Sequence, residues 1–186
     1  MAEGNNERRL GMRRVVCGVV EGKSTVLSDG EAPTEHAFAA LPGHVSSIMW
    51  GTFANPVLEP VVEAAPLGVR AIPGPGETRL LLAHFPPASV MFGEGFDPIE
   101  ADREQLAHLP GLAELFEADC PGMHRTHSID YDIVVEGRIW LELDDGNEVE
   151  LRAGDIAVQQ GTRHAWRNKS DAPATIAFVL IGAAQS

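Results

Sequence analysis

Cysteine is scarce in this chain of 186 residues, where only Cys17 and Cys120 occur. Two cysteines are too few for the disulfide framework of a small secreted protein, so the sequence is typical of a reducing compartment. No apolar run approaches the ~18–20 residues that a membrane-spanning helix needs. The basic N-terminal segment is not followed by the apolar core of a secretory signal. The sequence therefore predicts a cytoplasmic protein with no membrane partner.

Basic residues are also few, with 14 Lys and Arg against 27 Asp and Glu, which gives a formal net charge of −13. Binding to nucleic acid needs a clustered positive surface, so this balance argues against nucleic acid as a partner. The hydrophobic fraction of 44% and the charged fraction of 22% are close to globular averages. A chain of this length and composition predicts a single folded domain.

Long helical patterns are missing as well, because 19 Gly and 13 Pro interrupt the chain every few residues. The segments between these turn signals are short and rich in β-branched residues, which favours strands. In the C-terminal half they recur every ~8–12 residues, which is typical of a β-sandwich or barrel. The predicted strands cover residues 14–20, 23–27, 45–53, 78–85, 130–135, 138–143, 148–151, 155–158, 164–167 and 175–181.

The domain organisation follows from the same pattern. Residues 1–40 are predicted to form an N-terminal arm and loop, irregular over residues 1–12 and with a pair of strands after them. Residues 41–186 are predicted to form one barrel domain. Leucines at helical spacing between residues 98 and 119 predict a short helical insertion, which Pro110-Gly111 divides.

A row of polar residues near residue 130 shares one parity along the predicted strands. On an unbroken strand these side chains point to one face, and burying them is costly unless a ligand satisfies them. The row consists of His124, Thr126, Ser128, Asp130 and Asp132, and a second row consists of His164, Trp166 and Asn168. The sequence thus predicts a ligand site inside the barrel.

The two blocks that carry these rows, residues 122–137 and 154–168, resemble the paired motifs of the cupin superfamily. Gly137 closes the first block, and Gly161, His164 and Asn168 stand at the expected spacing in the second. The chain is similar to small single-domain cupins of bacteria and fungi. The resemblance implies an all-β fold, a cupin jelly-roll β-barrel, here with an N-terminal strand arm and a short helical insertion.

The resemblance also implies that His124, Asp130 and His164 hold a divalent metal such as Fe, Mn, Ni or Zn. The chain departs from the family pattern at two places. Thr126 stands at the second histidine position, with His127 one place later and on the opposite face, and Gln159 replaces a proline. The competing interpretation is a barrel that has lost its metal.

Residues close in sequence to these predicted ligands are candidates for further roles in the site. Proton transfer was assigned to Asp132, His127 and Tyr131, and His127 can reach the interior only if a bulge re-aims it. Thr126, Trp166 and Arg125 were assigned to a substrate pocket. Three of the four histidines outside the two blocks, His36, His44 and His108, are predicted to be surface groups.

Two classes of function fit these residues. The first is an enzyme that acts on a small oxygen-rich or aromatic metabolite, with metal-assisted oxygenation, decarboxylation, dehydration or isomerisation. The alternatives are a module that only binds or senses a small molecule, and a metal-free acid/base enzyme. The apolar N-terminal strand pair lies far before the barrel motifs in the sequence, and strands of this kind commonly add to the edge of a neighbour's sheet, so we also expect a homodimer.

Overall fold

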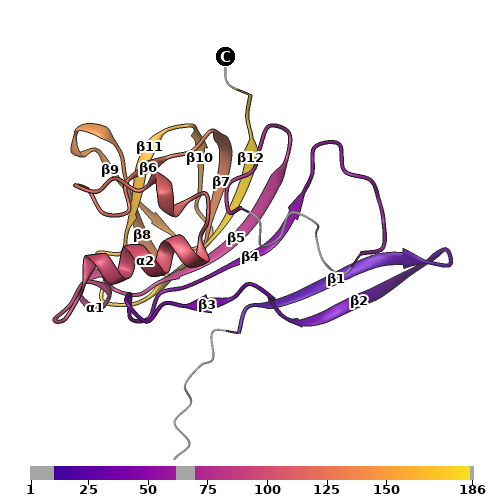
Figure 1. Cartoon of the computed structure of the whole chain (residues 1–186), viewed down its shortest axis with the longest axis horizontal. Coiled ribbons are helices and arrows are strands. Elements are labelled where there is room, and N and C mark those ends of the chain that lie inside the picture. Colours follow the sequence, from indigo (N-terminus) through magenta and orange to yellow (C-terminus); the bar gives the residue numbers. More distant parts are fainter. Residues whose placement is uncertain (1–10, 62–69, 185–186) are drawn as a thin grey trace, which may run out of the picture.

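The computed structural model describes residues 11–61 and 70–184, which form two β-sheets facing each other with helices at one side (Figure 1). The irregular stretch expected over residues 1–12 lies almost wholly outside the described residues. The strands are β1 (Arg13–Val20), β2 (Lys23–Glu31), β3 (His36–Ala37), β4 (Val45–Thr52), β5 (Thr78–Phe85), β6 (His124–Arg125), β7 (Ser128–Glu136), β8 (Arg138–Glu142), β9 (Glu148–Arg152), β10 (Ile156–Gln160), β11 (Arg163–Arg167) and β12 (Ala174–Gly182). The longer helices are α1 (Ala88–Met91) and α2 (Pro98–His108), and η1 (Ala113–Leu115) and η2 (Asp144–Gly146) are single 3₁₀ turns.

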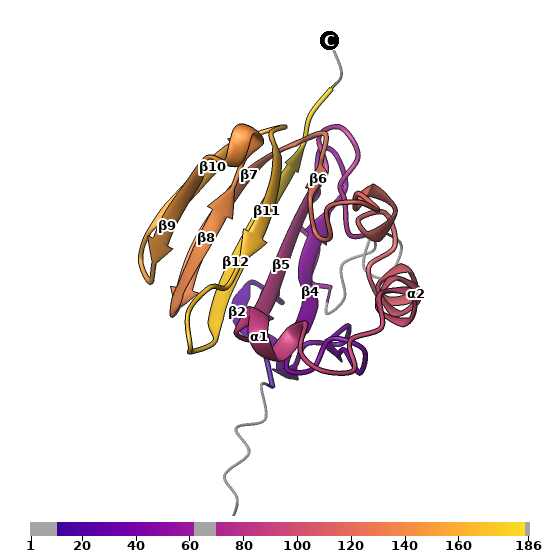
Figure 2. The ribbon, with the colours of Figure 1, turned by 90° about the vertical axis from the view of Figure 1, so that its left-hand side faces the viewer.

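The strand order is that of a jelly roll. A six-stranded sheet runs β10-β7-β12-β5-β4-β3, and a four-stranded sheet runs β6-β11-β8-β9. From β7 to β12 the chain passes repeatedly between the two sheets, as Figure 2 shows edge-on. Every strand expected from the sequence is present, which confirms the all-β cupin jelly-roll fold class. The two-residue strands β3 and β6 were not expected, because their length gives no periodic signal.

The hydrophobic core lies between the two sheets. Its central members come from facing strands and are almost completely inaccessible to solvent: Val134, Ile139, Leu141, Leu151, Trp166, Ala174 and Ile176. The strand pattern explains this arrangement, because alternate residues of β7, β8 and β12 point inward.

The helical segment covers one side of the barrel and begins at Ala88, earlier than the expected start at residue 98. The carboxylate of Asp97 caps α2 by accepting hydrogen bonds from the backbone N–H groups of Ile99 and Glu100. Buried apolar side chains attach this segment to the loop before β4: Phe38, Leu41, Met91, Ala101, Leu109 and Ala113. Among the described residues, no helix combines the length and apolar character needed to cross a bilayer.

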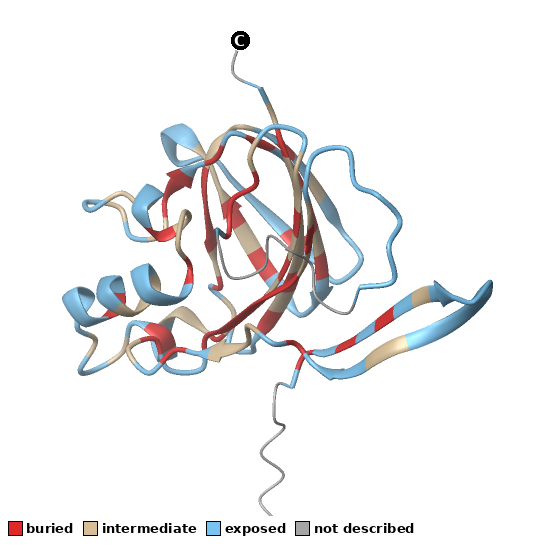
Figure 3. Cartoon of the chain, turned by 45° about the vertical axis from the view of Figure 1, so that its right-hand side comes forward, coloured by how far each residue is buried: buried red, intermediate tan, exposed pale blue. Residues whose placement is uncertain are grey.

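The arm is an antiparallel hairpin of β1 and β2 that projects from the barrel (Figure 3). It forms a separate two-stranded sheet, and its apolar side chains are largely exposed: Val15, Val19, Val20 and Val26. A second exposed apolar group lies on the outer face of β7 and β10: Ile129, Tyr131, Val135, Ile156 and Val158. Surfaces of this kind are typical of association between copies of a chain.

We predict that Gly137, which turns β7 into β8, is indispensable to the fold. Its φ is +78°, and an added Cβ would lie 2.3 Å from the carbonyl oxygen of Pro173. Gly137→Ala should lower the free energy of unfolding by about 3 kcal/mol or more, through backbone strain and overlap together. Gly146 is the control, because its φ is +71° but its Cβ would meet nothing within 4 Å. Chemical denaturation that shows equal losses for the two alanine variants would contradict this prediction.

We predict a homodimer that buries the exposed apolar residues of the arm and of β7 and β10. Light scattering at micromolar concentration should give twice the mass of one chain, because burial of apolar area drives association. The double variant Ile156→Lys and Val158→Lys should give one chain. The same substitution at the exposed Val149 of β9 is the control and should leave the dimer intact. A wild-type mass of one chain would contradict the prediction.

Candidate functional site

The polar row expected on one face is buried as a unit between the sheets. His124, Thr126, Ser128, Asp130 and Asp132 are all at most 9% exposed, whereas the residues between them in the chain face outward. The hydroxyl of Ser128 donates to Oγ1 of Thr126 at 2.9 Å, and Thr126 donates to Oδ2 of Asp130 at 3.3 Å. Three residues of the row, Ser128, Thr126 and Asp130, therefore form a connected chain of hydrogen bonds that ends on a carboxylate.

The two histidines of the motifs lie directly opposite each other on β6 and β11. Their ring centroids are 4.4 Å apart. A carbonyl oxygen can only accept, so Nδ1 of each ring carries the hydrogen: His124 donates to Gly122 and His164 to Thr162. Burial lowers the pKa of His124 to about 4 and also lowers the pKa of His164. Both rings are therefore neutral, with a lone pair on Nε2.

The two carboxylates of β7 differ in their surroundings. Each has one buried oxygen, Oδ1, that meets no hydrogen-bond partner among the described residues. Oδ2 of Asp132 accepts from Nε2 of Gln159 at 2.7 Å, and the hydroxyl of Thr162 fixes that amide by donating to its oxygen. Burial raises the pKa of Asp130, and it raises the pKa of Asp132 to about 7 with a further contribution from the charge of Asp130. At neutral pH, Asp130 therefore carries the charge of this pair more fully than Asp132.

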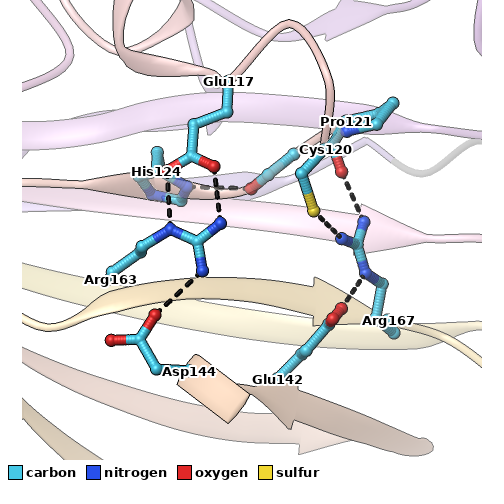
Figure 4. A network of polar contacts seen from close by, with 9 residues as sticks. Glu117, Cys120, Pro121, His124, Glu142, Asp144, Arg163 and Arg167 are labelled. Carbon is cyan, nitrogen blue, oxygen red and sulfur yellow. Dashed lines mark hydrogen bonds and ion pairs between the residues drawn. The ribbon is translucent and has the colours of Figure 1, made fainter. Parts of the chain in front are cut away.

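Two arginines of β11 hold the segment that precedes His124, as Figure 4 shows. Arg163 donates to both carboxylate oxygens of Glu117, at 2.7 and 2.6 Å, and also to Asp144. Arg167 contacts Cys120 and Pro121 on the same segment and pairs with Glu142 at 2.6 Å. These bidentate and shared pairs fix the loop that places the carbonyl of Gly122 against the His124 ring.

A cavity of about 460 Å³ opens beside this row. Its polar inner wall is formed by His124, Thr126, Asp130 and His164. The rest is mostly apolar and comes from both the barrel and the helical segment, including Leu81, Phe85, Phe92, Phe96, Phe116, Trp166, Phe178 and Leu180. The arrangement suits a largely apolar small molecule whose polar end reaches the inner wall.

Three of the residues assigned to the site lie elsewhere. Arg125, His127 and Tyr131 are exposed, and they are absent from the cavity wall. The reason is the alternation of buried and exposed residues from His124 to Asp132: His127 lies between β6 and β7 on the exposed side of this alternation, as Arg125 and Tyr131 do. We therefore correct their assignment and give them no role in the cavity. Asp132 is fully buried but lies outside the cavity lining, so it acts only through its neighbours.

Sequence reasoning placed two other residues wrongly or without a role. His44 was expected at the surface, but it is 7% exposed and lines the cavity, because the turn before β4 packs its ring beside Phe38 and Phe85. His36 is half-buried against Glu104, and only His108 is exposed as expected. Gln159 was noted only as a replaced proline, and its buried bond to Asp132 was not foreseen. The departure from the family pattern was the signal that could have pointed to it.

The donor types of the inner wall suit a divalent metal, since two neutral imidazoles and a carboxylate with an unpartnered oxygen are ordinary ligands. The arrangement of these side chains in the structure does not suit a bound metal ion. Within residues 11–61 and 70–184, no group of three or more His, Cys, Asp or Glu side chains is placed to hold a metal ion. The predicted set of His124, Asp130 and His164 lines one cavity without forming a three-ligand centre.

Comparison with family models points to the same part of the chain. Residues 118–181 match the family model described as a cupin domain. The matched part of the chain contains the whole polar row together with His164. A solved structure of a putative ethanolamine utilization protein from Salmonella typhimurium covers 92% of this chain and 97% of its own, with 8% identity and a TM-score of 0.44.

The curated relatives are fungal. A 67-residue stretch is 52% identical to the phomopsin biosynthesis cluster protein C' of Diaporthe leptostromiformis, over 33% of this chain and 35% of that protein. A 62-residue stretch is 42% identical to the cupin-domain-containing oxidoreductase fogC of Aspergillus ruber, over 32% of this chain and 30% of that protein. The matched region thus spans about a third of the length of these relatives.

We predict an acid-dependent loss of stability that is due to His44. Burial lowers the pKa of its imidazole to about 4 from an ordinary value near 6.5. The unfolded chain therefore binds this proton more readily between pH 6.5 and 4, so the stability contributed by the neutral ring is present above pH 6.5 and is lost as the pH falls toward 4. The stability difference between the wild type and His44→Phe should shrink by roughly 2–3 kcal/mol between pH 7.5 and 4.5.

Chemical denaturation at the two pH values measures this difference. Ser46→Ala is the control, because it removes a buried hydroxyl of β4, the strand that directly follows His44, and this hydroxyl does not titrate. Its effect should be the same at both pH values. A constant difference for His44→Phe as well would show that the buried ring does not resist protonation.

Proposed function

We propose that this protein is an enzyme that encloses a largely apolar small molecule and transfers a proton at its polar end. The observation that carries the proposal is the cavity itself, which is apolar over most of its wall and has Asp130 in its polar inner wall, with one buried carboxylate oxygen that meets no hydrogen-bond partner among the described residues. A charged oxygen without a partner is costly to bury in a purely structural role. Such a group is characteristic of a site that meets its partner in the ligand.

The residues of the inner wall divide the work. Asp130 Oδ1 takes the proton from the ligand, and Thr126 holds the other carboxylate oxygen in place. The neutral rings of His124 and His164 offer Nε2 lone pairs to hydroxyl groups of the ligand and orient it. Asp132 lies behind Asp130, where its raised pKa favours the protonated form and limits the charge of the pair.

The names of the relatives support an enzyme. Three are named biosynthesis cluster proteins. Four are named cupin-domain-containing oxidoreductases, and three of these have at least 40% identity over 62 residues. Their matched stretches correspond in length to the cupin domain. The mostly apolar cavity wall favours an apolar small molecule as the ligand.

Deuterium transfer tests this function. The purified protein is incubated in deuterium oxide with a small-molecule extract of the organism that makes this protein. Mass spectrometry follows the products. The wild type should convert at least one compound and place solvent deuterium in it. Asp130→Asn should convert that compound at least ~100-fold more slowly, because the proton acceptor is lost. The control Asp171→Asn changes an exposed carboxylate and should match the wild type. A compound that is retained but never converted would show a binding module instead.

Metal-assisted catalysis is the second candidate, and the neutral, paired rings of His124 and His164 favour it. Asp130, which lines the same cavity, would be the third metal ligand beside the two rings. A bound Fe, Mn, Ni or Zn ion would supply a Lewis acid that polarises a carbonyl oxygen of the ligand.

We predict that His164→Ala abolishes any micromolar binding of these four ions while leaving the far-ultraviolet circular dichroism unchanged, because a cavity ligand can be removed without breaking the sheet. Calorimetric titration with each ion measures binding. His127→Ala is the control, since this exposed ring should not contribute. A wild type that binds none of the four ions, or equal binding by His164→Ala, would leave the metal-free acid/base mechanism.

A further inference from the structure

The cavity has a second polar region at the start of β4. His44 and Ser46 line it, and both are buried. In the six-stranded sheet β4 is separated from β7, which carries Asp130, by β5 and β12. Three interstrand steps place these strands roughly 14 Å apart. The polar groups of β4 and β7 therefore belong to different parts of one cavity.

The His44 ring has a defined hydrogen-bonding state. Its Nδ1 donates to the carbonyl oxygen of His84 at 2.9 Å, which leaves the lone pair on Nε2. Phe38 and Phe85 pack beside the ring, with centroids 5.0 and 5.2 Å away, and they hold its orientation. Nε2 has no hydrogen-bond partner in the part of the chain that the structure describes. His44 is 7% exposed and lines the cavity, so this acceptor is satisfied by a donor that enters the cavity.

Ser46 adds a hydroxyl on β4, two residues after His44, which lies just before that strand, and both residues line the cavity. The wall between this pair and Asp130 is apolar and is formed by Leu81, Ala83, Phe178 and Leu180. An acceptor, a hydroxyl and an intervening apolar wall together define the ligand: a long apolar body with a polar group at each end.

We propose that His44 and Ser46 form a second polar subsite, which binds a hydroxyl group at the end of an elongated, largely apolar ligand far from Asp130. The inference rests on the proposed function, because it concerns the other end of the same ligand. Nε2 of His44 accepts the hydroxyl hydrogen, and the Ser46 hydroxyl donates to the hydroxyl oxygen. The subsite selects ligands by length and by this group, since an analogue without the hydroxyl leaves a buried acceptor unpaired.

Two probes that differ in one group test the subsite. 4,4′-Dihydroxybiphenyl carries a hydroxyl at both ends, and 4-hydroxybiphenyl carries it at one. The wild type should bind the dihydroxy probe about tenfold more tightly in calorimetric titration, which is the effect of about one buried hydrogen bond. His44→Phe should reduce this ratio to about one.

Ser46→Ala should also lower the ratio severalfold, and it removes only one oxygen, so it keeps the test valid if His44→Phe does not fold. His84→Phe is the matched control, because His84 is a buried histidine of the neighbouring strand that does not line the cavity. It should retain the tenfold preference.

Equal wild-type affinities for the two probes, no binding of either, or a preference that survives both substitutions would overturn the subsite. The outcome is separate from that of the deuterium experiment. A tenfold preference without any deuterium transfer would overturn the enzymatic function and leave the subsite, whereas deuterium transfer with equal affinities would do the reverse.

Discussion

The burial of a polar row between two apolar sheets is the constraint on which the rest of this structure depends. β7 contributes both to the hydrophobic core, through Val134, and to the buried polar row, through Asp130 and Asp132. Desolvation of these carboxylates is costly, and the fold offsets only part of that cost with Thr126 and Gln159. The remaining carboxylate oxygens meet no partner among the described residues, so part of that cost is not offset, and this supports the proposed site.

The surroundings of the row are built to keep it rigid. Backbone carbonyls select the tautomer of His124 and His164, and the Arg163–Glu117 pair holds the loop before β6. A defined tautomer matters, because it decides that these rings present acceptors to the cavity. The helical segment then closes the apolar side, so polar and apolar walls of one cavity come from parts of the chain far apart in sequence.

Much of the barrel could be predicted because its signals are local. Alternation along residues 124–132 and turn signals such as Gly137 are properties of neighbouring residues, and both survive folding unchanged. The same alternation placed His127 and Tyr131 on the outer face, and assigning them catalytic roles ran against that rule. Motif resemblance added the pairing of His124 with His164, which no local pattern contains.

The strand pattern could be predicted from the amino-acid sequence alone. So could the inward face of β7 and the polar residues on it, since side chains alternate along a strand with a period of two. Only the tertiary structure decided what surrounds them. It brought His44 from a loop into the cavity wall, set Gln159 against Asp132, and left His124, Asp130 and His164 beside one cavity without a three-ligand arrangement. Such relations depend on strand register and on distances between sheets, which arise from packing of the whole chain and not from any one segment.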